Sequence, residues 1–515
     1  MNGQVSAAVT LRAAIESFAF HGDARPALRD VEIVAAPGSL IAVLGGSGSG
    51  KSTLGRLLGG WLAGGRDGKL KGRLELESVG QQEAWRPLVF FGADSDPQID
   101  PAAWAEQVGY VPQDPAAMLS AVRATVEEEL AFGLENRGME RAEMVRIVAE
   151  TARRTGLASL LERDPATLSG GELRRLAVGC AIVADPAVLI LDEPLASLDA
   201  DGTRTLTELV AAELARGTAV VVLSQSADLL TRLAEPWLVL EDGAATAAGP
   251  PDRILAGEEL ASSGVVVSEP SGAPSGQVQQ FAQAQSRARP AKDSVPALEL
   301  DRVSFGFGTE YLGRPLLLEN VVLDVWPGEI VAVTGPNGAG KSTLLRLFNG
   351  LLSPLRGEVR IGGEAIAGVP TGVIAQRLGL LFQHPHDQLF ERTVLREVFF
   401  GLDRRFGASA PVRAAEALAS VGLSAAGNVH PHELSGSGQR LLALATVLAR
   451  EPEVLALDEP TVALDAHGLR RLSDAMTAAA GRGAAVVLVT HDLAFARAHA
   501  HRLVELRNGV LAAGD

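Results

Sequence analysis

The sequence predicts two α/β domains, each built around a parallel sheet. The chain has 515 residues, which is too long for a single hydrophobic core. A set of short motifs occurs twice in the same order, and in each copy short apolar runs alternate with stretches of helical length. Strands that alternate with helices are typical of a parallel α/β core, so the repeat predicts two such cores.

The spacing of the repeated motifs shows that the copies align over their second halves. A serine-headed motif, an acidic pair and a later polar motif follow one another at identical intervals in both copies, so no insertion separates them. The positions compared are Ser169, Glu193 and Gln225 in the first copy and Ser435, Glu459 and His491 in the second.

The first halves of the copies differ in length. The interval from Lys51 to Gln113 is longer than the equivalent interval from Lys341 to Gln383. The additional part of the first copy falls around 66–103, a polar stretch interrupted by Gly and Pro. We expect an enlarged surface loop or hairpin here, in a β-rich arm.

We expect a first domain over residues 1–256, a linker over 257–296 and a second domain over 297–515. The linker is rich in Ser, Gly, Pro, Gln and Ala, and because this composition cannot bury a core we expect it to stay flexible. A coil of that length spans roughly 35 Å, which is enough to let the two domains meet.

Short apolar runs mark the central strands of both copies. Leu40–Leu44 and Ile330–Thr334 stand directly before glycine-rich loops, and helices should begin at Lys51 and Lys341. Further runs without polar residues predict strands buried on both faces. These runs are residues 188–191, 219–223, 454–457 and 485–489.

Both glycine-rich loops fit the pattern G-x-x-x-x-G-K-[ST], which cradles phosphate groups. Glycines let backbone N–H groups turn toward phosphate oxygens, and the helix that follows directs its positive end at the same anion. The lysines should contact the β- and γ-phosphates, and the first serine after each lysine should ligand Mg²⁺. The residues assigned are Gly45, Gly48, Gly50, Lys51, Ser52 and Thr53 in the first loop, and Gly335, Gly338, Gly340, Lys341, Ser342 and Thr343 in the second.

An acidic pair ends an apolar run in each copy, as Asp192-Glu193 and Asp458-Glu459. The aspartate can hold Mg²⁺, and the glutamate can polarise an attacking water as a general base. An acidic surface turn is the alternative. However, two buried strands that both lead into two acids indicate a polar site at the strand ends.

A third motif, Leu168-Ser169-Gly170-Gly171-Glu172, reads as a helix N-cap on its own. Together with the acidic pair downstream it resembles the signature of the ATP-binding cassette (ABC) family, and the resemblance covers nearly the whole chain except the linker. The resemblance implies an antiparallel β arm and a helical subdomain beside each parallel core, two domains that pair head to tail, and ATP and Mg²⁺ as cofactors.

In that family each nucleotide lies between one domain's phosphate loop and the other domain's signature. The resemblance therefore implies that Ser169, Gly170, Gly171 and Glu172 face the nucleotide of the second loop, and that Ser435 and Gly436 face that of the first. Gln113 and Gln383 resemble glutamines that sense Mg²⁺ and contact a transmembrane partner. Phe20 and Phe307 stand where the family stacks an aromatic ring on adenine, although an aromatic in an edge strand can also simply pack.

Two departures from the family pattern distinguish the copies. Ser437 replaces the second glycine of the second signature, and its Cβ and hydroxyl can crowd the approach to phosphate. Gln225 stands where the second copy has His491, and glutamine cannot carry a proton. Head-to-tail pairing puts both departures in the site of Lys51. Our hypothesis is that the site of Lys341 does most of the hydrolysis; the alternative is that both sites work.

The residues after the two glutamines narrow the resemblance to the ATPase subunits of energy-coupling-factor (ECF) importers, which take up vitamins and transition-metal ions. The stretches concerned are His384-Pro385-His386-Asp387-Gln388-Leu389-Phe390, Asp114-Pro115 and Thr125-Val126. The resemblance implies a transmembrane T component that docks here, plus a substrate-binding membrane subunit. Our candidate docking positions are Met118, Leu119, Leu389 and Phe390, each of which can instead pack inside its own helical subdomain.

Composition excludes several classes. The net charge of −16 and pI near 5.2 argue against a nucleic-acid partner. The single cysteine, Cys180, excludes an intrachain disulfide, and its apolar helical surroundings favour a packed side chain over a reactive thiol. No apolar run is long enough to cross a bilayer, and residues 1–10 lack a signal-peptide pattern. We expect a peripheral protein on the cytoplasmic side of the cell membrane.

Two other functional classes stay open from the sequence. The ATPase of another ABC importer or exporter would share every motif named above. A soluble tandem cassette that acts on ribosomes or DNA would need a cationic contact surface. Such proteins also typically have a long, charged, helical linker, which residues 257–296 do not resemble.

Overall fold

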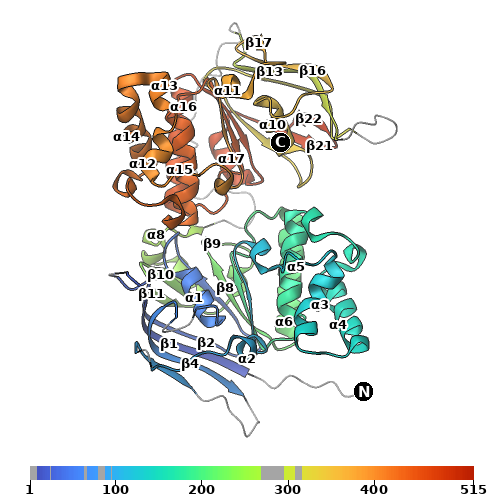
Figure 1. The fold of residues 1–515 in the computed structure, drawn as a ribbon, viewed down its shortest axis with the longest axis vertical. Coiled ribbons are helices and arrows are strands. Elements are labelled where there is room, and N and C mark those ends of the chain that lie inside the picture. Colours follow the sequence, from blue (N-terminus) through green and yellow to red (C-terminus); the bar gives the residue numbers. More distant parts are fainter. Residues whose placement is uncertain are drawn as a thin grey trace. The chain divides into compact units, whose positions relative to one another are not determined.

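The computed structural model describes residues 9–23, 25–62, 66–78, 87–93, 95–267, 295–307 and 316–514. The chain forms two compact units, Met1–Ser268 and Glu269–Asp515. Each unit combines a largely parallel sheet, an antiparallel β arm and a set of helices (Figure 1). The predicted fold class, two α/β domains with this internal division, is confirmed.

The described part of the first unit contains one ten-stranded sheet. In spatial order its strands are β5 (Leu88–Phe91), β4 (Gly68–Ser78), β1 (Val9–Phe20), β2 (Leu28–Ala35), β11 (Ala244–Gly249), β10 (Trp237–Glu241), β3 (Leu40–Leu44), β8 (Ala219–Ser224), β7 (Val188–Asp192) and β6 (Val108–Val111). The strands from β10 to β6 are parallel, whereas β5, β4, β1 and β2 pair antiparallel. Strands β3, β6, β7 and β8 are buried along their whole length, as expected when both faces of a parallel sheet are covered.

The helices of the first unit divide between the sheet and a separate helical subdomain. Helices α3 (Val126–Asn136) and α4 (Arg141–Arg154) share a hydrophobic core with part of α5 (Gly170–Ile182), and they lie away from β1, β2 and β4 (Figure 1). The remaining helices are α1 (Lys51–Leu58), α2 (Pro101–Ala105), α6 (Ala200–Ala215), α7 (Pro251–Leu255) and α8 (Glu259–Ser262).

The second unit has its strands in two sheets. The arm has the order β14 (Leu318–Val325), β13 (Leu298–Phe305), β16 (Arg356–Ile361) and β17 (Glu364–Ala365), with antiparallel pairing. The core has the order β18 (Leu378–Leu381), β19 (Val454–Asp458), β20 (Ala485–Val489), β15 (Ile330–Thr334), β21 (Arg502–Arg507) and β22 (Val510–Ala513), and its pairing is parallel except for β22. The arm stays tied to the core, because Glu319 N–H donates to Gly509 O at 2.8 Å, as Arg29 N–H donates to Gly243 O at 2.7 Å in the first unit.

The helices of the second unit repeat the division. A large core joins the sheet to the helical subdomain of α12 (Val394–Phe399), α13 (Leu402–Phe406), α14 (Ala410–Ser420) and α15 (Gly436–Leu448). The others are α10 (Lys341–Phe348), α11 (Thr371–Ile374), α16 (Ala466–Gly481) and α17 (Leu493–His499). The predicted central strands and the helix starts at Lys51 and Lys341 are confirmed in both units.

The additional residues of the first copy form a hairpin of the arm, as the sequence predicted. Strands β4 and β5 pair antiparallel, with Lys71 opposite Phe91 and Leu74 opposite Leu88. In the second unit the corresponding hairpin, β16–β17, is much shorter. Residues 79–86 between β4 and β5 lie outside the described residues.

The first unit extends past the boundary predicted at residue 256. Helix α8 is part of it, since Leu260 and Val265 are buried in its core, and strand β12 (Val266–Val267) pairs with β9 (Ser226–Ala227). The prediction of a linker from residue 257 was therefore wrong at this end, because the Ser- and Gly-rich composition concealed buried apolar positions. Residues 268–294 of the predicted linker lie outside the described residues.

Two smaller expectations concern the cysteine and the membrane. Cys180 is half-buried in α5, and its thiol donates to Glu129 O at 3.8 Å. Burial raises the pKa of this thiol to about 12, which disfavours a reactive thiolate and agrees with a packing role. Within the described residues, no helix is long and apolar enough to cross a membrane.

Candidate nucleotide-binding and hydrolysis sites

Each glycine-rich loop connects a central strand to a helix, as predicted. The first loop runs from β3 to α1 and ends at Gly50, with φ of 98°; the second runs from β15 to α10 and ends at Gly340, with φ of 100°. These left-handed values favour glycine. A Cβ on Gly45 would also lie 2.4 Å from Leu240 O. The tight shape of the loop therefore requires glycine where the sequence has it.

The lysines Lys51 and Lys341 are buried inside their loops. The ammonium of Lys51 donates to the carbonyl oxygens of the first two loop residues at 2.7 and 2.8 Å, and that of Lys341 makes the same two bonds at 2.8 and 3.0 Å. A buried cation at the N-terminal end of a helix, surrounded by a tight loop, is an anion site. Ser52 and Ser342 follow the lysines in the first turn of each helix.

Asp192 and Asp458 end β7 and β19 beside these loops. Burial raises the pKa of both carboxyls, and hydrogen bonds to Ser52 and Ser342 oppose part of the shift. The Oδ1 atom of each aspartate is buried and has no hydrogen-bond partner among the described residues. A buried carboxylate oxygen without a partner, next to a serine hydroxyl, fits a hard cation such as Mg²⁺.

The remaining ligands of such a cation would be phosphate oxygens and the predicted glutamines. Gln113 and Gln383 are half-buried and follow β6 and β18, the neighbours of the strands that carry the aspartates. The described part of the chain contains no group of three or more His, Cys, Asp or Glu side chains that could hold a metal by itself. The oxygens of Ser52 with Asp192 and of Ser342 with Asp458 are ligands of the kind that Mg²⁺ takes.

In the second unit Glu459 of the acidic pair contacts His491; we call His491 and its counterpart Gln225 the switch residues. His491 Nδ1 lies 2.9 Å from Glu459 Oε2, and the His491 backbone N–H donates to the same oxygen at 3.3 Å. Burial lowers the pKa of His491. The hydrogen bond with Glu459 and the charge of that carboxylate together raise the pKa by more than burial lowers it, so the net shift is upward. The geometry orients the Glu459 carboxylate and can supply a proton beside it.

In the first unit the equivalent pair shares a backbone hydrogen bond, from Gln225 N–H to the Glu193 carboxylate, but one oxygen of each side chain lacks a partner among the described residues. Glu193 Oε1 and Gln225 Oε1 are both buried, and neither has a hydrogen-bond partner among the described residues. Burial raises the pKa of the Glu193 carboxyl, with a further contribution from Asp192 and an opposing one from Lys51. The two sites thus differ in the partner of the glutamate side chain, although the backbone N–H of each glutamate makes the same bond to the neighbouring strand.

Both signature motifs start helices with an exposed serine cap. Ser169 forms a full capping box with Glu172, whose carboxylate accepts from Ser169 N–H at 2.7 Å and from its hydroxyl at 2.8 Å. Ser435 accepts from Gly438 N–H at 3.2 Å. Gly438 stands where the first unit has Glu172, so the second signature has no carboxylate to complete a capping box. The glycines that follow, Gly170 with Gly171 and Gly436, lie in the first helical turn of α5 and α15.

Ser437 does not distort the start of its helix. Its cap residue Ser435 has φ of −58° and ψ of 160°, close to the −65° and 159° of Ser169. Ser437 is buried, and a Cβ on Gly468 of α16 would lie 2.9 Å from its hydroxyl oxygen. The hydroxyl thus lies against the unit's own α16, and the crowding of phosphate predicted from the sequence stays a prediction.

The structure adds two residues that the motif analysis missed. Arg174 and Arg440 are buried one turn inside the signature helices, and each contacts the backbone after the acidic strand and after the neighbouring strand. Their signal in the sequence is an arginine at the same offset from each signature serine. A buried arginine that recurs in both copies at one offset indicates a shared contact.

The predicted adenine-stacking residues differ in exposure. Phe20 is half-buried and packs edge-on against Phe18, with ring centroids 5.0 Å apart. Phe307 makes the same edge-on contact with Phe305 but is 64% exposed. Only Phe307 thus presents most of its ring for stacking, and the role of both residues stays a prediction.

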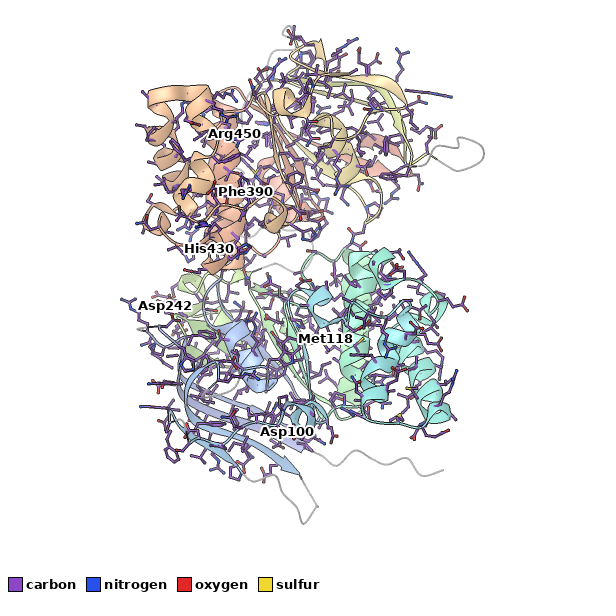
Figure 2. The ribbon with its side chains drawn as sticks, viewed as in Figure 1. Asp100, Met118, Asp242, Phe390, His430 and Arg450 are labelled. Atoms are coloured by element: carbon purple, nitrogen blue, oxygen red, sulfur yellow. The ribbon has the colours of Figure 1, made fainter. Side chains whose placement is uncertain are left out.

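The four predicted docking positions also differ in how far they are buried. Leu389 is buried in the core of the second unit, so the alternative of internal packing holds for it. Met118 and Leu119 are half-buried and pack against the sheet core and the helical subdomain, respectively (Figure 2 labels Met118). Phe390 is 63% exposed and remains available for an external contact.

Comparison with known proteins gives a family for these paired sites. The sequence profile of the family described as ABC transporter matches residues 28–196 and 318–462, which hold both phosphate loops and both acidic pairs. A protein of Methanosarcina acetivorans, provisionally named an ABC transporter ATP-binding protein, is 31% identical over 96% of this chain and 88% of its own length. A protein of Streptomyces avermitilis with the same provisional name is 33% identical over 97% of this chain and 91% of its own length.

A solved structure extends the likeness to the tandem arrangement. It is a complex of an archaeal ribosomal stalk protein and an archaeal ribosome recycling factor, with a TM-score of 0.61 and 19% identity over 97% of this chain and 90% of that chain. At this identity the likeness shows the fold alone. The family profile and the two relatives show that this chain belongs to the ABC transporter family of ATP-binding proteins, with two cassette domains that act as ATPases.

Proposed function

We propose that this chain is the ATP-hydrolysing component of an ECF-type membrane importer for a vitamin or a transition-metal ion. Its partners are a transmembrane T component and a substrate-binding membrane subunit, and the protein lies at the cytoplasmic face of the membrane. ATP binding closes the two units on each other and hydrolysis reopens them, and the movement passes to the T component.

The proposed mechanism pairs the two units head to tail. The signature of α5, with Ser169, then completes the site of Lys341, and the signature of α15 completes the site of Lys51. In the site of Lys341, Asp458 and Ser342 would hold Mg²⁺, and the cation would neutralise phosphate charge. The contact between Glu459 and His491 supports this site as the one that does most of the hydrolysis.

The observation that carries the membrane-partner proposal is an apolar groove in the second unit beside Gln383. It encloses about 270 Å³ and is lined, among others, by Leu351, Gln388, Phe390, Phe400 and Arg450 (Figure 2 labels Phe390 and Arg450). The rings of Phe390 and Phe400 meet edge-on with centroids 4.9 Å apart, although they are 63% and 50% exposed. Exposed aromatic pairs over a groove are typical of sites that anchor an apolar helix.

The first unit presents a different surface at this place. Ser120 N–H donates to the Glu129 carboxylate at 2.6 Å, and in the second unit Phe390 N–H donates to the Glu397 carboxylate at 2.9 Å. Because the two contacts are equivalent, Ser120 stands where the second unit has the exposed Phe390. The unequal surfaces support a partner that presents two unlike segments, as a single T component would.

The test is co-purification from membranes after expression together with the membrane proteins encoded nearby. We expect a small polytopic protein to remain bound, and Phe390→Asp to reduce the bound amount about tenfold or more, because a charge would enter an apolar contact. Val412→Asp is the matched control, since Val412 is 58% exposed on α14 and does not line the groove. Retention of a soluble binding protein or of an exporter subunit would overturn the ECF assignment.

The second candidate function is a soluble cassette protein that acts on ribosomes. The likeness to a ribosome recycling factor favours it at the level of the fold only. The net charge of −16 opposes it, because a surface that binds RNA phosphates needs an excess of cations. Co-sedimentation of the chain with ribosomes, in place of a membrane partner, would decide for this alternative.

A further inference from the structure

A buried arginine bridges the same two backbone carbonyls in both units. Arg174 Nη1 donates to Glu193 O at 2.9 Å and its Nη2 to Gln113 O at 3.1 Å. In the second unit Arg440 makes the equivalent bonds to Glu459 O at 2.9 Å and to Gln383 O at 2.8 Å. The two guanidinium groups thus repeat one arrangement, although the units differ in other contacts of the site.

The carbonyl that each arginine binds belongs to a strained residue. Glu193 has φ of 49° and Glu459 has φ of 47°, in the left-handed region that residues with a side chain rarely adopt. The backbone N–H of each glutamate is fixed as well, since it donates to Leu223 O at 2.8 Å or to Val489 O at 2.9 Å. The strand thus holds one side of the glutamate and the arginine holds the other, so the direction of the carboxylate depends on both.

Each arginine also connects three separate parts of its unit. It projects from the signature helix, α5 or α15, and it joins the end of the acidic strand to the segment after β6 or β18 that carries the predicted Mg²⁺-sensing glutamine. Both side chains are almost fully buried, with 6% and 5% exposure. A charge buried at this cost is retained where its hydrogen bonds determine a geometry.

We propose that Arg440 and Arg174 are positioning residues for ATP hydrolysis, which hold the glutamate of the acidic pair in register with the glutamine segment and the signature helix. The inference rests on the roles proposed for Glu459 and Gln383. Because the guanidinium is a rigid planar fork with two parallel donors, a movement of the signature helix or of the glutamine segment is passed to the glutamate carbonyl. Lysine carries one compact ammonium group and cannot reproduce this planar bridge.

The test compares Arg440→Lys with Arg175→Lys, a control on the half-buried arginine that follows Arg174 on α5. We expect Arg440→Lys to lower kcat about tenfold to hundredfold, since displacements of about 1 Å have effects of this size. The Kd for ATP should change less than about twofold, because the phosphate loop is untouched. Rates are expressed per molecule that binds a fluorescent ATP analogue, so unfolded protein does not contribute. Arg175→Lys should leave kcat within about twofold.

A variant of the second unit that is neutral but still a donor, Arg440→Gln, keeps the test open if the lysine variant folds poorly. It should also lower kcat with little change in Kd. Equal losses in kcat and in ATP affinity, in either variant, would show a merely structural role and overturn the inference. An unchanged kcat in both variants would do the same.

A double variant separates this inference from the proposed function. If Arg440 acts through Glu459, Arg440→Lys should cause no further loss in a Glu459→Gln background. A loss with Glu459→Gln but none with Arg440→Lys overturns the positioning role and leaves the function standing. No loss with Glu459→Gln removes the assigned role of Glu459, and the inference with it.

Discussion

The two acidic corners of this chain, at Glu193 and Glu459, have the same backbone conformation but differ in one side-chain partner. Glu193 and Glu459 have the same left-handed conformation, the same bond to the neighbouring strand and the same bridging arginine. Only Glu459 has a histidine partner at 2.9 Å, whereas Glu193 and Gln225 keep buried oxygens without partners among the described residues. The two copies thus agree more closely in the backbone of the site than in the side chain that contacts the glutamate.

The largest expected effect tests that comparison directly. Glu459→Gln should lower ATP turnover about 10²–10³-fold, because the glutamine cannot accept a proton from the attacking water. Glu193→Gln should lower it by no more than about threefold. Steady-state phosphate release by the two variants, at saturating ATP and Mg²⁺, measures both losses. Equal losses would remove the distinction between the corners, unless single-turnover rates show that the sites fire only together.

The second effect concerns the segments that follow the switch residues. After His491 the chain forms α17, which buries His499 against Phe495 and Ser473, whereas after Gln225 it forms the short strand β9. Burial lowers the pKa of His499 to about 4, below the usual value near 6.5. In the unfolded chain His499 therefore binds a proton below about pH 6.5, whereas in the folded chain it binds one only below about pH 4.

The stability of the second unit should consequently fall as the pH drops from 6.5 toward 4, by about 3 kcal/mol from this group. Urea unfolding followed at several pH values measures the loss. The variant His499→Phe keeps a ring at this position without a titratable nitrogen, and its stability should depend less on pH in that window. Parallel pH profiles for the two proteins would show that His499 does not contribute.

The smallest effect comes from exchanging the switch residues. His491→Gln should lower turnover about tenfold, since glutamine can donate a hydrogen bond but cannot carry a proton. In a Glu459→Gln background, Gln225→His should raise the residual rate about two- to fivefold by giving Glu193 the missing partner. Phosphate release measures both. A residual rate that stays flat would mean that Gln225 is not what weakens the first corner.

Much of the fold followed from patterns that the local sequence carries. Uninterrupted apolar runs predicted the central strands, and the loop glycines predicted where α1 and α10 begin, because a strand buried on both faces and a phosphate-binding turn each restrict which residue types they accept. The hairpin of β4 and β5 followed from a length difference between the copies. These features depend on neighbours in sequence, so they can be read without knowing the tertiary contacts.

The features that the sequence did not reveal depend on contacts between distant residues. Composition suggested a linker from residue 257, but Leu260 and Val265 are buried by a core assembled from the whole unit. Leu389 and Phe390 are adjacent and both apolar, yet Leu389 is buried in the core of the second unit and Phe390 is 63% exposed. The arginine bridge of the first unit joins segments that lie far apart in the chain, which no local motif encodes.

The pairing of β12 with β9 has a mechanical consequence. Val266 N–H donates to Gln225 O at 2.8 Å, and Ser263 O accepts from Gly46 N–H at 2.8 Å, so a few residues clasp the switch position and the phosphate loop together. This last described segment of the first unit is thus hydrogen-bonded to two parts of the Lys51 pocket, so a shift of the segment would displace the phosphate loop and Gln225 together.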